Sequence, residues 1–240
     1  MAIKIVFGSM KGGVAKTTVS RSIAILLREQ NQRVLLIDLD PSASLTDSLK
    51  DGFLSDELQE DDLMAYQAMQ QKDLRKGIHP VFQNLDILPA SHHLQQFPNL
   101  LASERTDSFI HDLIREIERD YDFIILDVAP ILNDLHVNAV VAADYVIPIF
   151  DTKDLLRQNT SYLNFLKEIH ATQDSVPQVL GIIASLIRLR NQTETEVLDA
   201  ASTDVKDLLF ETVILDRERG GDNPNTIYRP LLKEMLNRLQ

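Results

Sequence analysis

The chain has 240 residues, of which 44% are hydrophobic and 25% are charged. These proportions are close to those of globular proteins and exclude a disordered or low-complexity chain. Because it has no cysteine, the chain cannot hold a disulfide, a thiolate metal site, an iron–sulfur cluster or a cysteine nucleophile, and we expect it to work in a reducing cytoplasm. The net charge of −12 favours solubility and argues against a partner as negative as nucleic acid.

The length suits a single domain over residues 1–240, because two domains of ordinary size need more chain. No stretch approaches 18 uncharged apolar residues, and the apolar run that ends before Gly8 is too short for the core of a signal peptide. We therefore expect a protein that is neither exported nor membrane-spanning.

Short apolar runs rich in β-branched residues alternate with amphipathic segments, which is the pattern of βαβ units. The predicted strands are Ile3–Phe7, Arg33–Asp38, Leu85–Pro89, Phe123–Asp127, Tyr145–Phe150 and Val179–Ser185. The predicted helices are Thr17–Gln30, Ser108–Asp120, Asp134–Ala143, Lys153–His170 and Asn225–Leu239. Because each strand run is almost continuously apolar, we expect an α/β fold with a doubly wound, mostly parallel sheet flanked by helices on both faces.

The segment between the first predicted strand and the first predicted helix carries the strongest functional signal. It contains Gly8, Gly12 and Gly13, followed by Lys16 and Thr17. Glycines let backbone N–H groups turn toward phosphate oxygens, and the positive N-terminus of the next helix faces the same anion. We predict that Lys16 neutralises the β- and γ-phosphates of a nucleotide and that the Thr17 hydroxyl ligates Mg²⁺.

This loop departs from the usual pattern G-x-x-x-x-G-K-[ST], with Met10 and Ala15 where glycines are expected. It resembles the deviant Walker A motif K-G-G-x-G-K-[ST]-[ST] of the ParA/MinD family of P-loop NTPases, with Lys11 in the place of the family's signature lysine. The resemblance implies that ATP is bound by Lys11, Gly12, Gly13, Val14, Ala15, Lys16, Thr17 and Thr18. Ala15 replaces a family glycine, and if this position needs a positive φ, alanine costs on the order of 1 kcal/mol and retunes nucleotide handling.

Two further segments carry the resemblance. Asp38 and Asp40 end a buried strand in the family's switch I pattern D-x-D-P, and Asp127 ends another strand as in a Walker B motif. The resemblance implies that Asp40 orients the attacking water, that Asp38 supports the Mg²⁺ shell or the switch geometry, and that Asp127 holds Mg²⁺ through water. Together with Lys11 and Lys16, these groups are sufficient for slow, Mg²⁺-dependent ATP hydrolysis. The similarity covers residues 1–150 well and residues 151–240 more loosely.

The resemblance also implies partners. In this family the signature lysine, here Lys11, reaches the nucleotide of a second subunit, so that ATP joins a homodimer and hydrolysis releases it. The dimer binds nonspecific DNA through arginines, for which Arg190 and Arg219 are the candidates, although solvated charges or local salt bridges are the alternative for both. A ParB-like centromere-binding protein or another adaptor would stimulate hydrolysis. The implied protein is a ParA-like ATPase of the cytoplasm and nucleoid that segregates plasmid, chromosome or protein cargo.

Two other functions stay open. A MinD-like ATPase would bind membranes through a C-terminal amphipathic helix, and the tail has an apolar stripe, although a helix docked on the sheet would show the same stripe. The stripe consists of Leu231, Leu232, Met235, Leu236 and Leu239. Alternatively, Ala15 has abolished turnover, and the chain is a degenerate ATP-binding scaffold.

Three further observations narrow the functional classes. The lack of cysteine excludes the cluster-carrying relatives of the family. His92 and His93 are adjacent with no third ligand at a helical spacing, so we expect no metal site there. Residues 51–73 hold seven acidic side chains against one lysine, which is half of the net charge, and we expect a solvated helix or loop.

Overall fold

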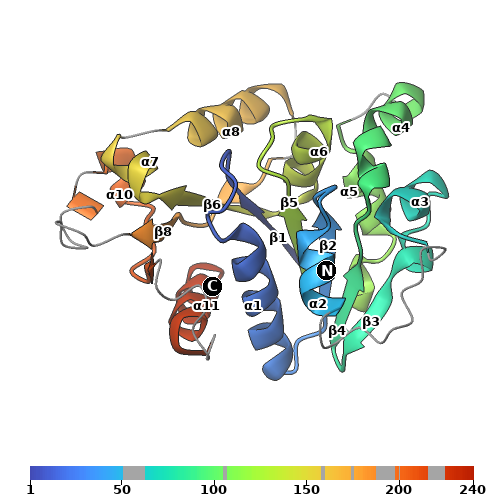
Figure 1. Cartoon of the computed structure of the whole chain (residues 1–240), viewed down its shortest axis with the longest axis horizontal. Coiled ribbons are helices and arrows are strands. Elements are labelled where there is room, and N and C mark those ends of the chain that lie inside the picture. The colour runs from blue at the N-terminus through green and yellow to red at the C-terminus, as the bar shows by residue number, and fades with distance from the viewer. Residues whose placement is uncertain are drawn as a thin grey trace.

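The computed structural model describes residues 1–50, 63–104, 107–157, 160–173, 176–187, 198–199, 201–215 and 225–240. Within these ranges a mostly parallel sheet runs through the molecule and helices cover both of its faces (Figure 1). The strands are β1 (Ile3–Gly8), β2 (Val34–Leu39), β3 (His79–Phe82), β4 (Leu85–Leu88), β5 (Phe123–Val128), β6 (Tyr145–Asp151), β7 (Gln178–Val179), β8 (Ile183–Ile187) and β9 (Ile214–Leu215). The fold class predicted from the sequence is confirmed.

The strand order is β3-β4-β2-β5-β1-β6-β8-β9, with β7 paired to β6. Among the described strands, every pairing is parallel except that of β3 with β4. The chain begins in the middle of the sheet at β1 and winds first toward β4, then back toward β9. Ligands of such sheets bind at the carboxyl ends of the strands, where the winding direction reverses.

The helices form one layer on each face of the sheet. The α-helices are α1 (Lys16–Glu29), α2 (Ser44–Lys50), α3 (Ala65–Gln70), α4 (Phe97–Glu104), α5 (Phe109–Arg115), α6 (Asp134–Ala142), α7 (Thr152–Leu156), α8 (Ser161–Thr172), α10 (Thr203–Lys206) and α11 (Asn225–Arg238). Short 3₁₀ turns lie at Leu74–Gly77, His92–Gln96 and Glu118–Asp120. Helices α1, α2 and α11 pack on one face, and α3, α4, α5, α6 and α8 pack on the other (Figure 1).

Alternate strand residues supply two separate cores. Leu36 and Ile125 face the layer of α1 and α11, whereas Ile37 and Leu126 face the layer of α6 and α8. All four are fully buried, as expected for strands whose side chains alternate between two covered faces. The continuous apolar runs in the sequence arise from this double coverage.

Two predicted helices are wrong in their extent. The segment Lys153–His170 forms two helices, α7 and α8, because the backbone leaves the helical region at Arg157 and Thr160. The segment Ser108–Asp120 ends as an α-helix at Arg115 and continues into the 3₁₀ turn, which brings Glu118 against the buried Lys4 at 3.2 Å. The predicted strand Val179–Ser185 is divided between β7 and β8, which both pair with β6.

Candidate nucleotide-binding site

The loop between β1 and α1 contains two residues with left-handed backbone conformations. Gly13 has a φ of 77°, and Ala15, the last residue before α1, has a φ of 70° and a ψ of 18°. Residue 15 therefore has the positive φ on which the strain expected from the sequence depended. Alanine in this conformation costs roughly 1 kcal/mol because its Cβ crowds the following carbonyl oxygen.

The first turn of α1 is tied to the end of β5 through a buried aspartate. The Thr17 hydroxyl donates to Asp127 Oδ2 at 2.8 Å, and the Ser20 hydroxyl donates to Asp127 Oδ1 at 3.0 Å. Burial raises the pKa of Asp127 to about 6, while the Thr17 hydrogen bond and the charge of Lys16 oppose this rise. Burial also lowers the pKa of the Lys16 ammonium, against the pull of Asp127 and Asp40.

Asp38 lies opposite Asp127 in the pairing of β2 with β5 and is completely buried. Its Oδ2 accepts hydrogen bonds from the Thr46 N–H at 2.9 Å and the Thr46 hydroxyl at 2.7 Å, and its Oδ1 accepts from the Asp40 N–H at 3.1 Å. Burial, and then the charge of Asp127, raise the pKa of Asp38 to about 7, although Thr46 opposes the shift. Asp38 therefore ties β2 to α2 and to Asp40.

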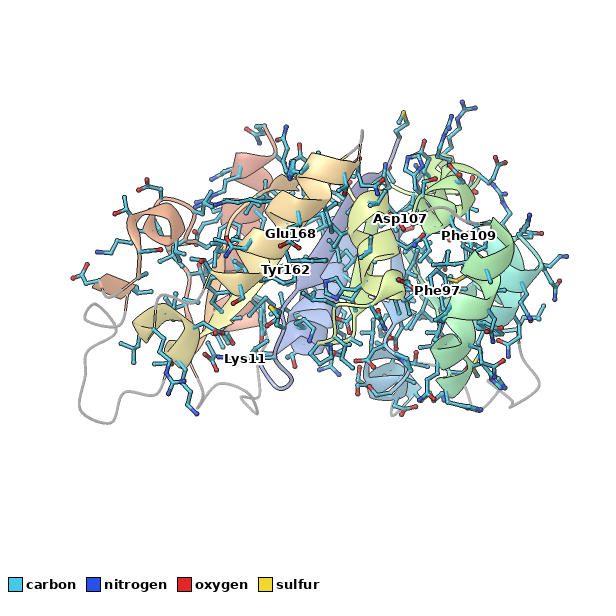
Figure 2. All side chains as sticks on the ribbon, turned by 90° about the horizontal axis from the view of Figure 1, so that it is seen from above. Lys11, Phe97, Asp107, Phe109, Tyr162 and Glu168 are labelled. Atoms are coloured by element: carbon cyan, nitrogen blue, oxygen red, sulfur yellow. The ribbon has the colours of Figure 1, made fainter. Side chains whose placement is uncertain are left out.

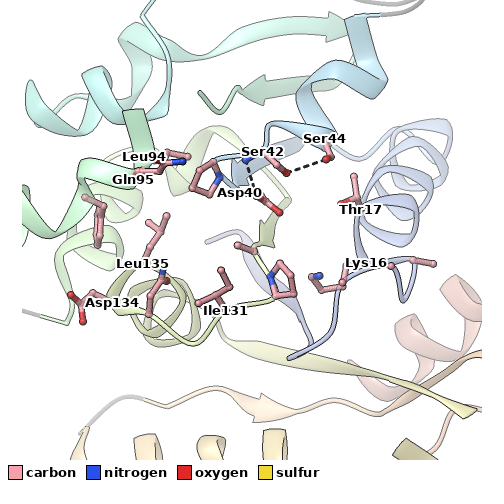
Figure 3. Close-up of a pocket in the computed structure, with 18 of the residues that line it drawn as sticks. Lys16, Thr17, Asp40, Ser42, Ser44, Leu94, Gln95, Ile131, Asp134 and Leu135 are labelled. Atoms are coloured by element: carbon pink, nitrogen blue, oxygen red, sulfur yellow. Dashed lines mark hydrogen bonds between the residues drawn. The ribbon is translucent and has the colours of Figure 1, made fainter. Parts of the chain in front are cut away.

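A cavity of about 950 Å³ opens beside this loop (Figure 3). One wall is polar and comes from the loop, the start of α1 and the segment after β2. It consists of Gly12, Gly13, Ala15, Lys16, Thr17, Thr18, Asp40, Pro41, Ser42 and Ser44. The rest of the lining comes from the 3₁₀ turn before α4, the β5–α6 loop and the start of α6, and it includes Leu94, Ile131 and Leu135 (Figure 3). Asp40 is held in place by the Ser42 N–H, which donates to its Oδ1 at 2.8 Å.

Lys11 points away from this polar wall. Its ammonium nitrogen lies 3.0 Å from Asp151 Oδ1 at the end of β6 and 2.6 Å from Asp154 Oδ1 in α7. Partial burial acts to lower the pKa of Lys11, but the two carboxylates raise it overall. Val14 is also turned inward and buried, and its carbonyl accepts a hydrogen bond from the Ser185 hydroxyl of β8 at 2.9 Å. Of the eight loop residues predicted to bind nucleotide, the other six line the cavity.

The oxygen ligands around Thr17 fit a hard cation such as Mg²⁺. The Thr17 hydroxyl, the Asp127 carboxylate bonded to it and the Asp40 carboxylate that lines the same cavity all offer oxygen atoms, which this ion prefers as ligands. In the described ranges no three histidine or acidic side chains cluster as a metal site of their own.

Sequence reasoning did not single out four of these polar partners: Ser20, Thr46, Asp151 and Asp154. Only Ser20 has a local signal, since it lies four residues after Lys16 and hence on the same face of α1. Arg190 and Arg219 lie outside the described residues, as does the 51–62 part of the acidic segment.

The apolar stripe of the C-terminal tail packs against the core, where three of its residues are buried and Leu236 and Leu239 are partly buried. Leu231, Leu232 and Met235 are at most 2% exposed and pack with α1 and the sheet. Arg238 fastens the end of α11 by donating to the carbonyl of Leu208 at 2.9 Å. The docked helix is therefore the correct interpretation of this stripe. In the described part of the chain no helix is long and apolar enough to cross a membrane.

Comparison with known proteins identifies the family. Residues 2–182 match the family described as AAA domain. The virulence plasmid ParA family protein pGP5-D of Chlamydia psittaci is 31% identical over 95% of this chain and 83% of the relative. The chromosome-partitioning ATPase Soj of Thermus thermophilus is 29% identical over 99% of this chain and 96% of the relative.

A solved structure shows the same fold with a nucleotide. Cobyrinic acid a,c-diamide synthase from Mycobacterium smegmatis, with bound ATP analogue and magnesium, is 25% identical and has a TM-score of 0.81. The match covers 100% of this chain and 96% of that one. The resemblance found in the phosphate loop and the two aspartate motifs thus extends over the chain, which belongs to the ParA family of partition ATPases.

Proposed function

We propose that this protein is a Mg²⁺-dependent ATPase that dimerises on ATP, binds nonspecific DNA and positions or segregates a cargo. One observation carries the enzymatic part of the proposal. Thr17, at the start of α1, is hydrogen bonded to the buried Asp127, and Lys16 and Asp40 line the same cavity. This arrangement brings phosphate-binding, cation-binding and water-orienting groups together.

Each group has a role in the proposed reaction. Backbone N–H groups of Gly12 and Gly13 and the N-terminus of α1 hold phosphate oxygens, and Lys16 balances their charge. Thr17, supported by Asp127, would hold Mg²⁺, which would supply positive charge to the phosphate oxygens. Asp40 orients the attacking water. We assign Asp38 to the switch geometry, because its carboxylate fastens Thr46 and the Asp40 N–H.

Dimerisation is proposed through Lys11. Its ammonium is paired with Asp151 and Asp154 of its own chain, so contact with a nucleotide in a second subunit requires that this pair open. The triphosphate supplies a higher density of negative charge than two carboxylates, and this favours the exchange. We propose that ATP binding in this way replaces the ion pair of Lys11 with Asp151 and Asp154 by an ion pair of Lys11 with the nucleotide of the second subunit.

The DNA-binding part of the proposal is supported by the names of the relatives, which include chromosome-partitioning and plasmid ParA proteins. Arg190 and Arg219 remain the candidates for contact with DNA. We propose that the dimer works in the cytoplasm on the nucleoid and that a ParB-like or other adaptor stimulates its slow hydrolysis. The buried stripe of α11 gives no support to a membrane-bound cycle.

Phosphate release with and without Mg²⁺ tests the enzymatic part. We expect the wild-type chain to release phosphate only with Mg²⁺, and Asp40→Ala to lower kcat by about 10²-fold or more while ATP still binds. Asp47→Ala is the matched control, because Asp47 is an exposed acid of α2 that pairs with Lys50 at 3.3 Å. A wild-type chain that binds ATP without hydrolysing it would instead be a degenerate scaffold.

A further inference from the structure

Two buried polar side chains outside the proposed reaction, His136 and Tyr162, join the two loops that flank the site. His136 lies in the first turn of α6 and is 1% exposed, and Tyr162 lies in α8 and is 3% exposed. Their side chains meet with His136 Nε2 2.8 Å from the Tyr162 hydroxyl oxygen. Phe165 packs its ring against both, with centroids 5.6 Å from each.

The hydrogen-bond partners fix the protonation of this pair. His136 Nδ1 lies 3.2 Å from the carbonyl oxygen of Ala129, which can only accept, so Nδ1 carries the proton. Burial lowers the pKa of His136 to about 4, so the ring is neutral near pH 7 and Nε2 has a free lone pair. The Tyr162 hydroxyl therefore donates to Nε2.

One end of this connection is the loop after β5. Ala129 and Pro130 line the cavity beside the phosphate loop and directly follow the strand that carries Asp127. The N-terminus of α6 is fixed by Asn133, whose side-chain oxygen accepts from the His136 N–H at 3.0 Å. His136 thus holds the loop by both its ring and its backbone.

The other end is the beginning of the phosphate loop. A Cβ added to Gly8 would lie 1.8 Å from the Tyr162 hydroxyl oxygen, so the absence of a side chain at Gly8 makes room for the tyrosine. Tyr162 also lines a small cavity together with Ser9, Met10 and Lys11. Tyr162 belongs to α8 and is buried, whereas Lys11 lies on the phosphate loop at the edge of the molecule (Figure 2).

We propose that His136 and Tyr162 are positioning residues, which set the spacing between the β5–α6 loop and residues 8–11 of the phosphate loop through one continuous chain of hydrogen bonds and packing. This inference rests on the proposed ATPase function. Neither side chain contacts phosphate or water in the reaction. Both act by keeping Asp127, Ala129 and Lys11 at fixed positions relative to one another. Such positioning matters because a misplacement of about 1 Å can lower the reaction rate by up to 10²-fold.

Tyr162→Phe removes only the donating hydroxyl and is the direct test. The matched control is Tyr121→Phe, because the Tyr121 hydroxyl donates to Asp86 Oδ2, also at 2.8 Å, near the opposite ends of the strands. We expect both variants to lower the unfolding midpoint, but only Tyr162→Phe to lower kcat, by about tenfold, with the KM for ATP changed less than about twofold. His136→Gln, which keeps a donor and an acceptor, should retain more activity than His136→Ala. Equal kcat values for the two tyrosine variants would overturn the proposal.

A second measurement separates this inference from the proposed function. If the wild-type chain releases no phosphate, the ATPase proposal fails, and nuclear magnetic resonance on the nucleotide-free protein decides the inference. We expect unprotonated Nε2 in His136, and Tyr162→Phe should shift the amide resonances of residues 8–11 and also those of Ala129 and Ile131. A protonated Nε2, or shifts confined to α8, would contradict it.

Discussion

At the scale of single residues, Ala15 is the position where the chain departs most clearly from its family's loop motif. Its φ of 70° is uncommon for any residue with a side chain, and it closes the loop just before α1. The strain is local, and Lys16 and Thr17 still face the cavity. We therefore expect alanine at this position to cost stability, while Lys16 and Thr17 keep their places beside the cavity.

Ala15→Gly should stabilise the protein. Removing the Cβ relieves the strain of the left-handed conformation, so we expect the free energy of unfolding, measured by urea titration, to rise by roughly 1 kcal/mol. The greater conformational freedom of glycine in the unfolded chain reduces this gain somewhat. Ala102→Gly is the control, since Ala102 is exposed within α4 and should lose up to about 1 kcal/mol. A less stable Ala15→Gly variant would show that the positive φ is not strained.

His136 makes the stability of the fold depend on pH. Its pKa is lowered by burial to about 4, below the ordinary value of 6.5, so in this range the unfolded chain binds a proton that the folded chain does not. Its contribution is complete above pH 6.5 and is lost as the pH falls toward 4. From pH 7 to pH 5 we expect a loss of about 2 kcal/mol.

Replacing His136 by a side chain that does not titrate should remove this loss. Wild-type and His136→Gln proteins are to be unfolded in urea at pH 7 and pH 5, and the wild-type should lose about 2 kcal/mol more. Asp38 and Asp127 have pKa values raised by burial, so their stabilising effect declines as the pH rises, but they titrate in both proteins and cancel in the comparison. An equal loss in both proteins would contradict a neutral buried His136.

At the scale of elements, local sequence predicts the helices and strands along a segment but does not predict side-chain contacts between segments that are far apart in the chain. The strands around the site and the start of α1 follow from apolar runs and glycines, and they are confirmed. Asp38 was predicted at the correct strand end, yet its partner Thr46 was not, because that contact depends on how α2 packs. The pairing of Lys11 with Asp151 and Asp154 joins residues about 140 positions apart and has no local signal.

Helix α11 offers a test of docking against membrane binding. Leu231 is fully buried against the core that contains α1, so Leu231→Ala should lower the free energy of unfolding by roughly 3 kcal/mol. Lys233→Ala on the exposed side of the same helix should change it by less than about 0.5 kcal/mol. Calorimetry or urea unfolding gives both values. A helix reserved for membranes would tolerate Leu231→Ala without loss of stability.

At the scale of the whole molecule, the net charge of −12 is an overall value and does not determine the charge of the surface proposed to bind DNA. Half of this charge lies in residues 51–73, away from the phosphate loop and from the candidate arginines in sequence. An acidic monomer should bind DNA weakly, and a dimer that doubles a basic patch should bind it usefully. The two arginines proposed to contact DNA, Arg190 and Arg219, lie outside the described residues.

Lys11→Ala tests the dimer. Light scattering should show an ATP-dependent dimer for the wild-type protein and for the control Lys76→Ala, which replaces an exposed lysine of the 3₁₀ turn Leu74–Gly77. Lys11→Ala should bind ATP and remain a monomer, because the contact to the second nucleotide is missing. An ATP-dependent dimer of Lys11→Ala would refute the trans role of this lysine.

The most direct test of the central proposal compares retention on nonspecific DNA with sedimentation on anionic lipid vesicles, both with Mg²⁺ and with or without ATP. We predict ATP-dependent retention on DNA that weakens steeply as NaCl rises, is lost in Lys11→Ala, and falls when Arg190 or Arg219 is replaced. Vesicles should sediment no more protein with ATP than without it. A partition ATPase that works on DNA would be contradicted by retention on DNA that does not depend on ATP or on the NaCl concentration. It would also be contradicted by ATP-dependent sedimentation with vesicles in the absence of DNA binding.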